Sequence, residues 1–100
     1  MLGNARLKPI ATTLSTLYTA SDDCVVSSIV ICNIGSASSF RVAVRPLGAS
    51  IDDSHYIYYD LPLDANDTFI FTGGITLKST DVLSVYSGSG NISFNLFFST

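Results

Sequence analysis

The side chains able to do acid–base or nucleophilic chemistry are few in this sequence. The one histidine, His55, lies in the segment DDSHYIYYD, among aspartates and tyrosines. Nucleophilic catalysis needs a nucleophile held beside a base, and no G-x-S-x-G or comparable motif frames a serine here. We therefore interpret His55 as a half-exposed polar residue between a loop and a strand. The sequence predicts no catalytic residue and no enzyme activity.

Carboxylates occur in two adjacent pairs, Asp22-Asp23 and Asp52-Asp53. Neighbours in an extended chain point in opposite directions, and aspartates in turns usually accept hydrogen bonds from backbone N–H groups. The segment DANDT, residues 64–68, gathers oxygen atoms suited to Ca²⁺, but it lacks the spacing and the glycine of an EF-hand loop. We expect turns in all three places, an Asx turn being favoured over calcium in DANDT, and no metal or cofactor.

The two cysteines, Cys24 and Cys32, are eight residues apart in one apolar segment. In a single strand that spacing is roughly 26 Å, whereas the Cα atoms of a disulfide lie within about 7 Å of each other. Two cysteines and one histidine also fall short of a zinc ligand set. Both cysteines are expected to be small buried apolar residues.

Two arginines are the first candidates for contact with other molecules. Arg41 and Arg45 lie on one face of a predicted strand, about 13 Å apart, with Ala43 between them, so that face should be flat and basic. Two interpretations stay open. The arginines could pair with Asp52, Asp53 or Asp60 inside the domain, or they could pair with carboxylates of a neighbouring subunit, which a guanidinium binds with two hydrogen bonds.

Aromatic residues supply the other contact candidates. In the run YIYYD, alternation places Tyr56 and Tyr58 on one face of a strand and Ile57 and Tyr59 on the other. Core packing explains one of these faces but not both, and tyrosine suits an interface anchor or a surface on which a sugar stacks. Phe97 interrupts the last alternation by facing away from the core. The interface candidates are thus Arg41, Arg45, Tyr56, Tyr58 and Phe97.

The elements that position these residues are predicted to be short strands separated by turns. Abundant β-branched, aromatic, Ser and Thr residues indicate an all-β chain. Residues 24–33 are apolar on both parities, which is typical of a central strand covered on both sides. An extended region is expected over residues 7–19, and strands are expected over 24–33, 39–45, 55–59, 67–72, 75–77, 82–86 and 91–98.

Regular strand spacing without a βαβ rhythm predicts one architecture. We expect an antiparallel β-sandwich of about seven or eight short strands, immunoglobulin-like or jelly-roll-like, with a small closed barrel as the main alternative. The 100 residues are expected to form a single domain over 1–100, with residues 1–13 as a possible extended N-terminal arm. The segment LPLDAND, residues 61–67, is expected to be a turn-rich crossover.

The composition indicates association with other proteins. Only 13% of the residues are charged, all eight acidic residues are aspartate, and the formal net charge is −3. Isolated small domains usually carry more surface charge, and subunit interfaces are depleted in charge and rich in Tyr and Phe, so we expect a homo-oligomer or a larger assembly. Five cations are too few for a nucleic-acid surface. No apolar run reaches the ~20 residues of a membrane span, and the N-terminus lacks the pattern of a secretory signal.

Several long segments together resemble a known family. They are TLYTASDDCVVSSIVICNIGSASSFRVAVRP and HYIYYDLPLDANDTFIFTGGITLKSTDVLSVYSGSGNISFNLF. In this order they resemble a family of short structural proteins of tailed bacteriophages and prophages, over about residues 16–97. The chain departs from that family at SDDC, where a Pro-Ala-Gly-like turn is usual. These segments are structural and contain no catalytic signature.

The resemblance implies a non-enzymatic virion protein, assembled in the host cytoplasm with copies of itself and with a larger virion protein. A tail, neck or baseplate position is slightly preferred, and a capsid decoration (cement) protein is the alternative. A second class of function is a carbohydrate or host-surface binding module that uses YIYYD. No nucleic acid, membrane or cofactor is expected as a partner.

Overall fold

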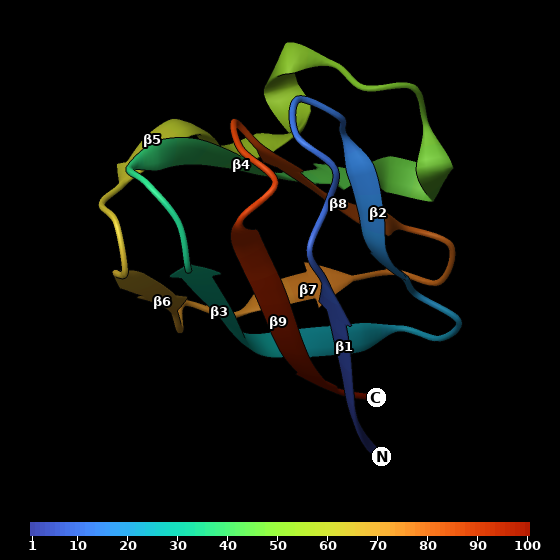
Figure 1. Cartoon of the computed structure of the whole chain (residues 1–100). Coiled ribbons are helices and arrows are strands. Elements are labelled where there is room, and N and C mark those ends of the chain that lie inside the picture. The colour runs from blue at the N-terminus through green and yellow to red at the C-terminus, as the bar shows by residue number, and fades with distance from the viewer.

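The chain forms two antiparallel β-sheets that pack face to face (Figure 1). The computed structural model describes residues 1–100. Sheet A has the strand order β1-β9-β3-β6, with β7 also paired to β3, and sheet B has the order β2-β8-β4-β5. The strands are β1 (Leu2–Leu7), β2 (Ser15–Thr19), β3 (Cys24–Asn33), β4 (Ser38–Arg45), β5 (Tyr56–Leu63), β6 (Thr68–Phe71), β7 (Ile75–Leu77), β8 (Val82–Ser87) and β9 (Ile92–Ser99).

The strand pairs are nested along the sequence, each pair enclosing the next. β1 pairs with β9, β2 with β8, β3 with β6 and β7, and β4 with β5, all antiparallel. Because β6 and β7 occupy one position beside β3, interrupted at Gly73-Gly74, the nine strands fill eight positions. Two four-position sheets with this nesting are the jelly roll. The predicted all-β sandwich is confirmed in its jelly-roll form, and the closed-barrel alternative is wrong.

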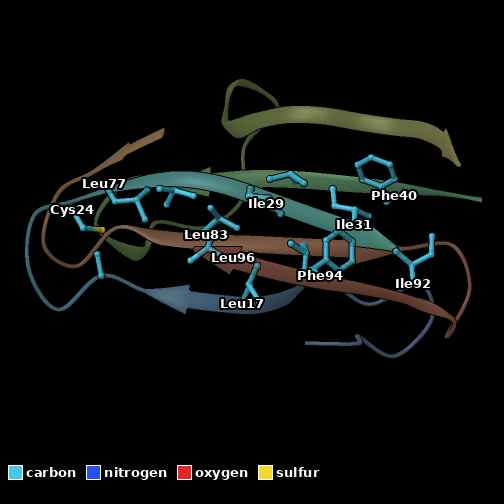
Figure 2. Packing of buried hydrophobic residues seen from close by; sticks show 14 of the residues in the cluster. Leu17, Cys24, Ile29, Ile31, Phe40, Leu77, Leu83, Ile92, Phe94 and Leu96 are labelled. Atoms are coloured by element: carbon cyan, nitrogen blue, oxygen red, sulfur yellow. The ribbon is translucent and has the colours of Figure 1, made fainter. Parts of the chain in front are cut away.

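The core lies between the sheets and is built by alternation along the strands (Figure 2). In β9 the side chains of Ile92, Phe94 and Leu96 are fully buried. From sheet B, Phe40 meets Phe94 with ring centroids 6.1 Å apart in an edge-to-face arrangement. Aromatic pairs of this geometry add to the stabilisation from buried apolar area. The fully buried core residues with the largest side chains are Phe40, Phe94, Ile29, Ile31, Leu77, Leu83, Ile92 and Leu96.

One buried polar residue, Asn33, joins three segments at one end of the sandwich. Its Nδ2 donates to the carbonyl oxygens of Ser36 at 2.9 Å, Leu63 at 3.2 Å and Asp64 at 3.2 Å. Its Oδ1 accepts from the N–H of Gly35 at 3.0 Å. A side chain with no exposed area must satisfy its polar atoms inside the protein. Asn33 thereby fixes the turn after β3 against the end of β5.

Most predicted strands are found within one or two residues of their expected bounds, and two regions differ. The predicted crossover at residues 61–67 is wrong in its first half, because β5 continues to Leu63 and Pro62 pairs with Ser39. Proline is tolerated there because β5 is an edge strand. Within the expected N-terminal arm, residues 2–7 form β1, hydrogen-bonded to β9 along its whole length. Leu7 and Ala5 alternate inward onto the core, which explains the pairing.

The expectation that residues 24–33 are covered on both sides is wrong. Val26, Ile29 and Ile31 are buried, whereas Val25 is 50% exposed and Val30 only partly buried. The strand is central, between β9 and the β6–β7 position, but only its inner face lies against the second sheet. A bulge between Val26 and Ser28 shifts the parity of the buried residues. The apolar residues of the outer parity therefore remain at the surface.

The outside of sheet B, by contrast, is covered by the chain itself. Residues 46–55 fold back over it and form the green segment at the top of Figure 1. The N–H of Leu47 donates to Asp81 Oδ1 at 2.9 Å, and Arg45 Nη1 donates to the carbonyl oxygen of Ala49 at 2.9 Å. As a result the outward-facing Ala43 and Ser84 are buried to 0% and 1% exposure.

Candidate functional site

Arg41 is the centre of a cluster of tyrosines on the outer side of sheet B. Its Nε lies 2.7 Å from Oδ1 of Asp60, and its Nη2 lies 3.3 Å from Oδ2, so the guanidinium binds the carboxylate with two hydrogen bonds. The guanidinium carbon is 4.1 Å from the ring centroids of both Tyr59 and Tyr86, close enough for cation–π attraction. The hydrogen bond to Asp60 raises the pKa of Arg41 above its ordinary value.

For Arg41 the structure shows the first of the two interpretations, pairing with a carboxylate inside the domain. Arg45 has no carboxylate partner in the structure. Its Nε donates to Ser84 Oγ at 3.1 Å, and its Nη1 donates to carbonyl oxygens of the covering loop. Ala43 between them is buried. The expected flat basic face is therefore wrong: Arg41 joins β4 to β5 through Asp60, and Arg45 joins β4 to the covering loop.

The expected pairing of Tyr56 with Tyr58 on one face is also wrong. Tyr58 points inward, with its ring 5.3 Å from that of Phe69 and 6.1 Å from that of Phe40. Tyr56 lies outside, edge-to-face with Tyr59 at 4.9 Å. Two register shifts between β4 and β5 break the alternation, and Asp60 adopts a positive φ of 52°. A bulge turns the following side chains to the other face, which strict alternation does not anticipate.

An open cleft of about 380 Å³ adjoins this cluster. It is lined by Asp53, Tyr56 and Tyr59, and Tyr59 is 59% exposed. An aromatic wall beside a carboxylate can stack against an apolar face of a ligand and accept hydrogen bonds from hydroxyl groups. The cleft has the chemistry of a shallow polar-ligand site and contains no nucleophile–base pair.

Phe97, the fifth interface candidate, lies on the opposite side of the molecule. It is 38% exposed on the outside of sheet A and pairs with Asn4 of β1 and Ser28 of β3. The sequence prediction that it faces away from the core agrees with this placement. Phe98 packs inward, 4.4 Å from the ring of Tyr18. The five candidates therefore belong to two separate surfaces and the core.

His55, Asp52 and Asp23 have structural partners. His55 Nδ1 accepts from the N–H of Asp52 at 3.1 Å, and the Asp52 carboxylate accepts from the N–H of Ser54 at 3.0 Å, so both close a single helical turn. The bonds from Ser54 lower the pKa of Asp52. Asp23 accepts from the N–H of Ser79 at 2.8 Å, and that bond, with Lys78, lowers its pKa.

No group of three or more His, Cys, Asp or Glu side chains is gathered in a way that could hold a metal ion. None of the helical segments has the length and apolar character needed to cross a membrane. The two cysteines lie in different surroundings: Cys24 is buried in the core and Cys32 is partly exposed. Both are free thiols, and Cys32 is not the buried residue expected from its apolar neighbours.

No protein-family model and no curated protein sequence matches the chain. Among solved structures, the fold is similar to a chain in the acid-stable capsid structure of Helicobacter pylori bacteriophage KHP30. The TM-score is 0.61 at 14% identity, over 98% of this chain and 85% of that chain. At this identity the likeness shows the fold alone.

Two Drosophila melanogaster structures are also similar, CENP-C bound to CAL1 and the CENP-C cupin domain. Their TM-scores are 0.37 and 0.35, at 15% and 16% identity. They are matched over 97% of this chain but only 59% and 58% of those chains. Values below 0.5 do not establish a shared fold.

Sequence reasoning missed the covering of sheet B and the tyrosine cluster around Arg41. Both depend on the loop at residues 46–55 and on bulges in β5, which bring together residues far from one another in a strict strand pattern. The signal that could have suggested the loop is Arg45-Pro46, since proline ends a strand and presets a turn.

Proposed function

We propose that this chain is a non-enzymatic structural protein of a bacteriophage particle, where it assembles with copies of itself and with a larger virion protein. The observation that carries the proposal is the fold likeness to a chain of a bacteriophage capsid structure, over 98% of this chain and 85% of that chain. The jelly roll occurs in viral capsid proteins and also in lectins and cupins, and a fold does not by itself define a function. The likeness therefore supports the proposal together with the independent resemblance to tailed-phage proteins.

The chemistry of the chain supports the same proposal. His55, Asp52 and Asp23 each accept a hydrogen bond from a backbone N–H group, which is a structural role. Only 13% of the residues are charged. A surface with so little charge is suited to being covered by neighbouring subunits.

Within the particle we place the chain on the capsid shell, as a decoration protein. The fold likeness to a capsid chain favours this position, whereas the tail, neck or baseplate position preferred from the sequence stays a prediction. The two positions differ in copy number, because a shell presents many equivalent sites and a tail or neck presents few.

The test is quantitative mass spectrometry of purified particles from a strain that encodes this chain, with the major capsid protein as the internal standard. Hundreds of copies per particle are expected. A few to a few dozen copies, in multiples of three, five or six, would move the protein to the neck, tail or baseplate. Its absence from particles that contain the major capsid protein would overturn the virion proposal.

A second candidate function, binding of a host-surface glycan, is favoured by the cleft of Tyr56, Tyr59 and Asp53. A sugar ring could stack on exposed Tyr59 while Asp53, whose carboxylate has no hydrogen-bond partner in the structure, accepts from hydroxyl groups. An array of bacterial polysaccharides probed with the purified protein tests it. Binding lost in Tyr59→Ala but kept in Ile57→Ala, a neighbouring exposed residue, is the expected result. Absence of binding to every polysaccharide would exclude this role for the host glycans on the array.

A further inference from the structure

The outside of sheet A is a surface that nothing in the chain covers. The residues that alternate with the buried ones along each strand form this face. Val30 pairs with Ile70 on one side and with Asn95 on the other, and all three point away from the core. Ile70 is 59% exposed, Val25 50% and Phe97 38%. In Figure 1 the outer side of β1, β9 and β3 faces away from sheet B, at the bottom of the view, with no loop across it.

This face is also almost free of charge. Arg6 is the one charged residue in the five strands of sheet A, and its Nε already donates to Asn95 Oδ1 at 3.2 Å. All eight aspartates lie in loops or in β5 of the opposite sheet. The protein as a whole nevertheless carries a net charge of −3. Two copies therefore repel each other least when they approach through sheet A, because no carboxylate is brought into the contact.

We propose that the outer face of sheet A is the surface through which two copies of this chain associate, sheet against sheet. This deepens the proposed assembly with copies of itself by naming the surface used. In a two-fold contact the same patch serves both partners. A two-fold arrangement is suited to this patch, because a face almost free of charge needs no oppositely charged partner surface. Arg6 lies at the rim of the contact because β1 is the edge strand. Sheets that pack in this way align within about 30° and lie about 10 Å apart.

The size of the face is sufficient for a stable pair. β3 has ten residues, or roughly 33 Å, and four neighbouring strands at about 4.8 Å give a width of roughly 19 Å. The projection is thus roughly 600 Å², and the accessible area exceeds it because side chains stand out from the sheet. A standard interface uses about 800 Å² on each partner. Sheet B offers a smaller open face, because residues 46–55 lie over part of it.

The first experiment measures sedimentation velocity of the purified full chain from about 1 to 100 µM, with the matched variants Phe97→Asp, Ile70→Asp and Ile57→Asp. The wild type is expected to shift from 10.7 kDa to twice that mass. Phe97→Asp and Ile70→Asp should weaken the association at least ~30-fold, because each buries an unpaired carboxylate in the contact. Ile57 is 39% exposed on β5, almost equal to Phe97, so Ile57→Asp adds the same charge elsewhere and should associate like the wild type.

A second readout uses Cys32, which lies on the same outer parity of β3 and pairs with Thr68 and Ser93. Alkylation by iodoacetamide, quantified for each cysteine by peptide mass spectrometry, should slow at Cys32 as the protein concentration rises. Cys24 is buried in the core and serves as the internal reference. In Phe97→Asp the rate at Cys32 should not depend on protein concentration.

Three outcomes would overturn the inference. One is a wild type that remains at 10.7 kDa up to 100 µM, another is association that both sheet A variants leave unchanged, and the third is equal weakening by Ile57→Asp. If the wild type is monomeric but Phe97→Asp alone is lost from particles, the face instead contacts a larger virion protein. A dimer whose chain is absent from particles would refute the virion proposal and leave this inference standing, so the two failures are distinguishable.

Discussion

Replacement of Asn33 by leucine tests whether a single buried amide holds one end of the sandwich together. The amide has two N–H hydrogens shared among three carbonyl oxygens and one oxygen that accepts from Gly35. Three hydrogen bonds at about 0.5–1.5 kcal/mol each give a loss of roughly 2–4 kcal/mol. For a domain of this size, the melting temperature should fall by roughly 10–25 °C.

The assay is urea denaturation of Asn33→Leu beside the control Asn4→Leu, whose side chain is exposed on β1. Both are measured at one low protein concentration, so that self-association does not add to the apparent stability. Asn33→Asp supplies a second check, since the introduced carboxyl lacks the amide donors at neutral pH and regains one on protonation. Its defect should shrink on acidification relative to wild type at each pH. If Asn33→Leu stays within about 0.5 kcal/mol of the control, the hydrogen-bond argument is refuted.

The remaining predictions concern the core, the thiols and pH. Phe40→Ala removes a fully buried ring and should lower the free energy of unfolding by about 3–5 kcal/mol in urea denaturation; a loss under 1 kcal/mol would mean the core collapses around the gap. Burial raises the pKa of Cys24, so in native protein at pH 8 and low concentration a thiol reagent should modify Cys32 well before Cys24, and equal rates in peptide maps would contradict the packing. The pKa values of Asp23 and Asp52 are lowered in the folded protein, so their charged carboxylates stabilise the fold at pH values above the ordinary pKa of 3.8. This stabilisation is lost as the pH falls through the lowered pKa values. The melting temperature should therefore drop less between pH 5 and pH 2.5 in the double variant D23N/D52N than in the wild type. An equal drop in both proteins would show that these two carboxylates do not contribute to the pH dependence of stability.

The strands with strict alternation could be predicted from the sequence because one physical signal decides them. In residues 39–45 and 91–98 every second side chain is apolar, and burial of that parity leaves one register with a packed core. The same signal could not select between the immunoglobulin and jelly-roll connections. Strand order depends on which distant strands pair, and the local pattern does not contain that information.

The surface was less predictable than the core. β5 places Tyr58 inside and Tyr59 outside through two bulges, and no residue type in YIYYD marks them. Arg41 was a sound candidate because a bidentate guanidinium fits a carboxylate, but whether the partner is internal depends on the bulge in β5 that places Asp60 beside Arg41. Phe97 could be placed correctly because it departs from an otherwise regular alternation.

The nested strand order has a consequence for how the protein is made. The innermost pair, β4 with β5, is central in the sequence, and each further pair encloses it, until β1 meets β9 and the backbone N–H of Thr100 donates to the carbonyl oxygen of Met1 at 2.8 Å. During synthesis β1 and β2 emerge first, yet their partners in the sheets emerge last. Sheet A cannot close before the final strand is available, and contacts between distant residues form slowly. Sheet A should therefore fold only after β9 has emerged from the ribosome, and until then the apolar residues of β3 remain exposed to other newly made copies.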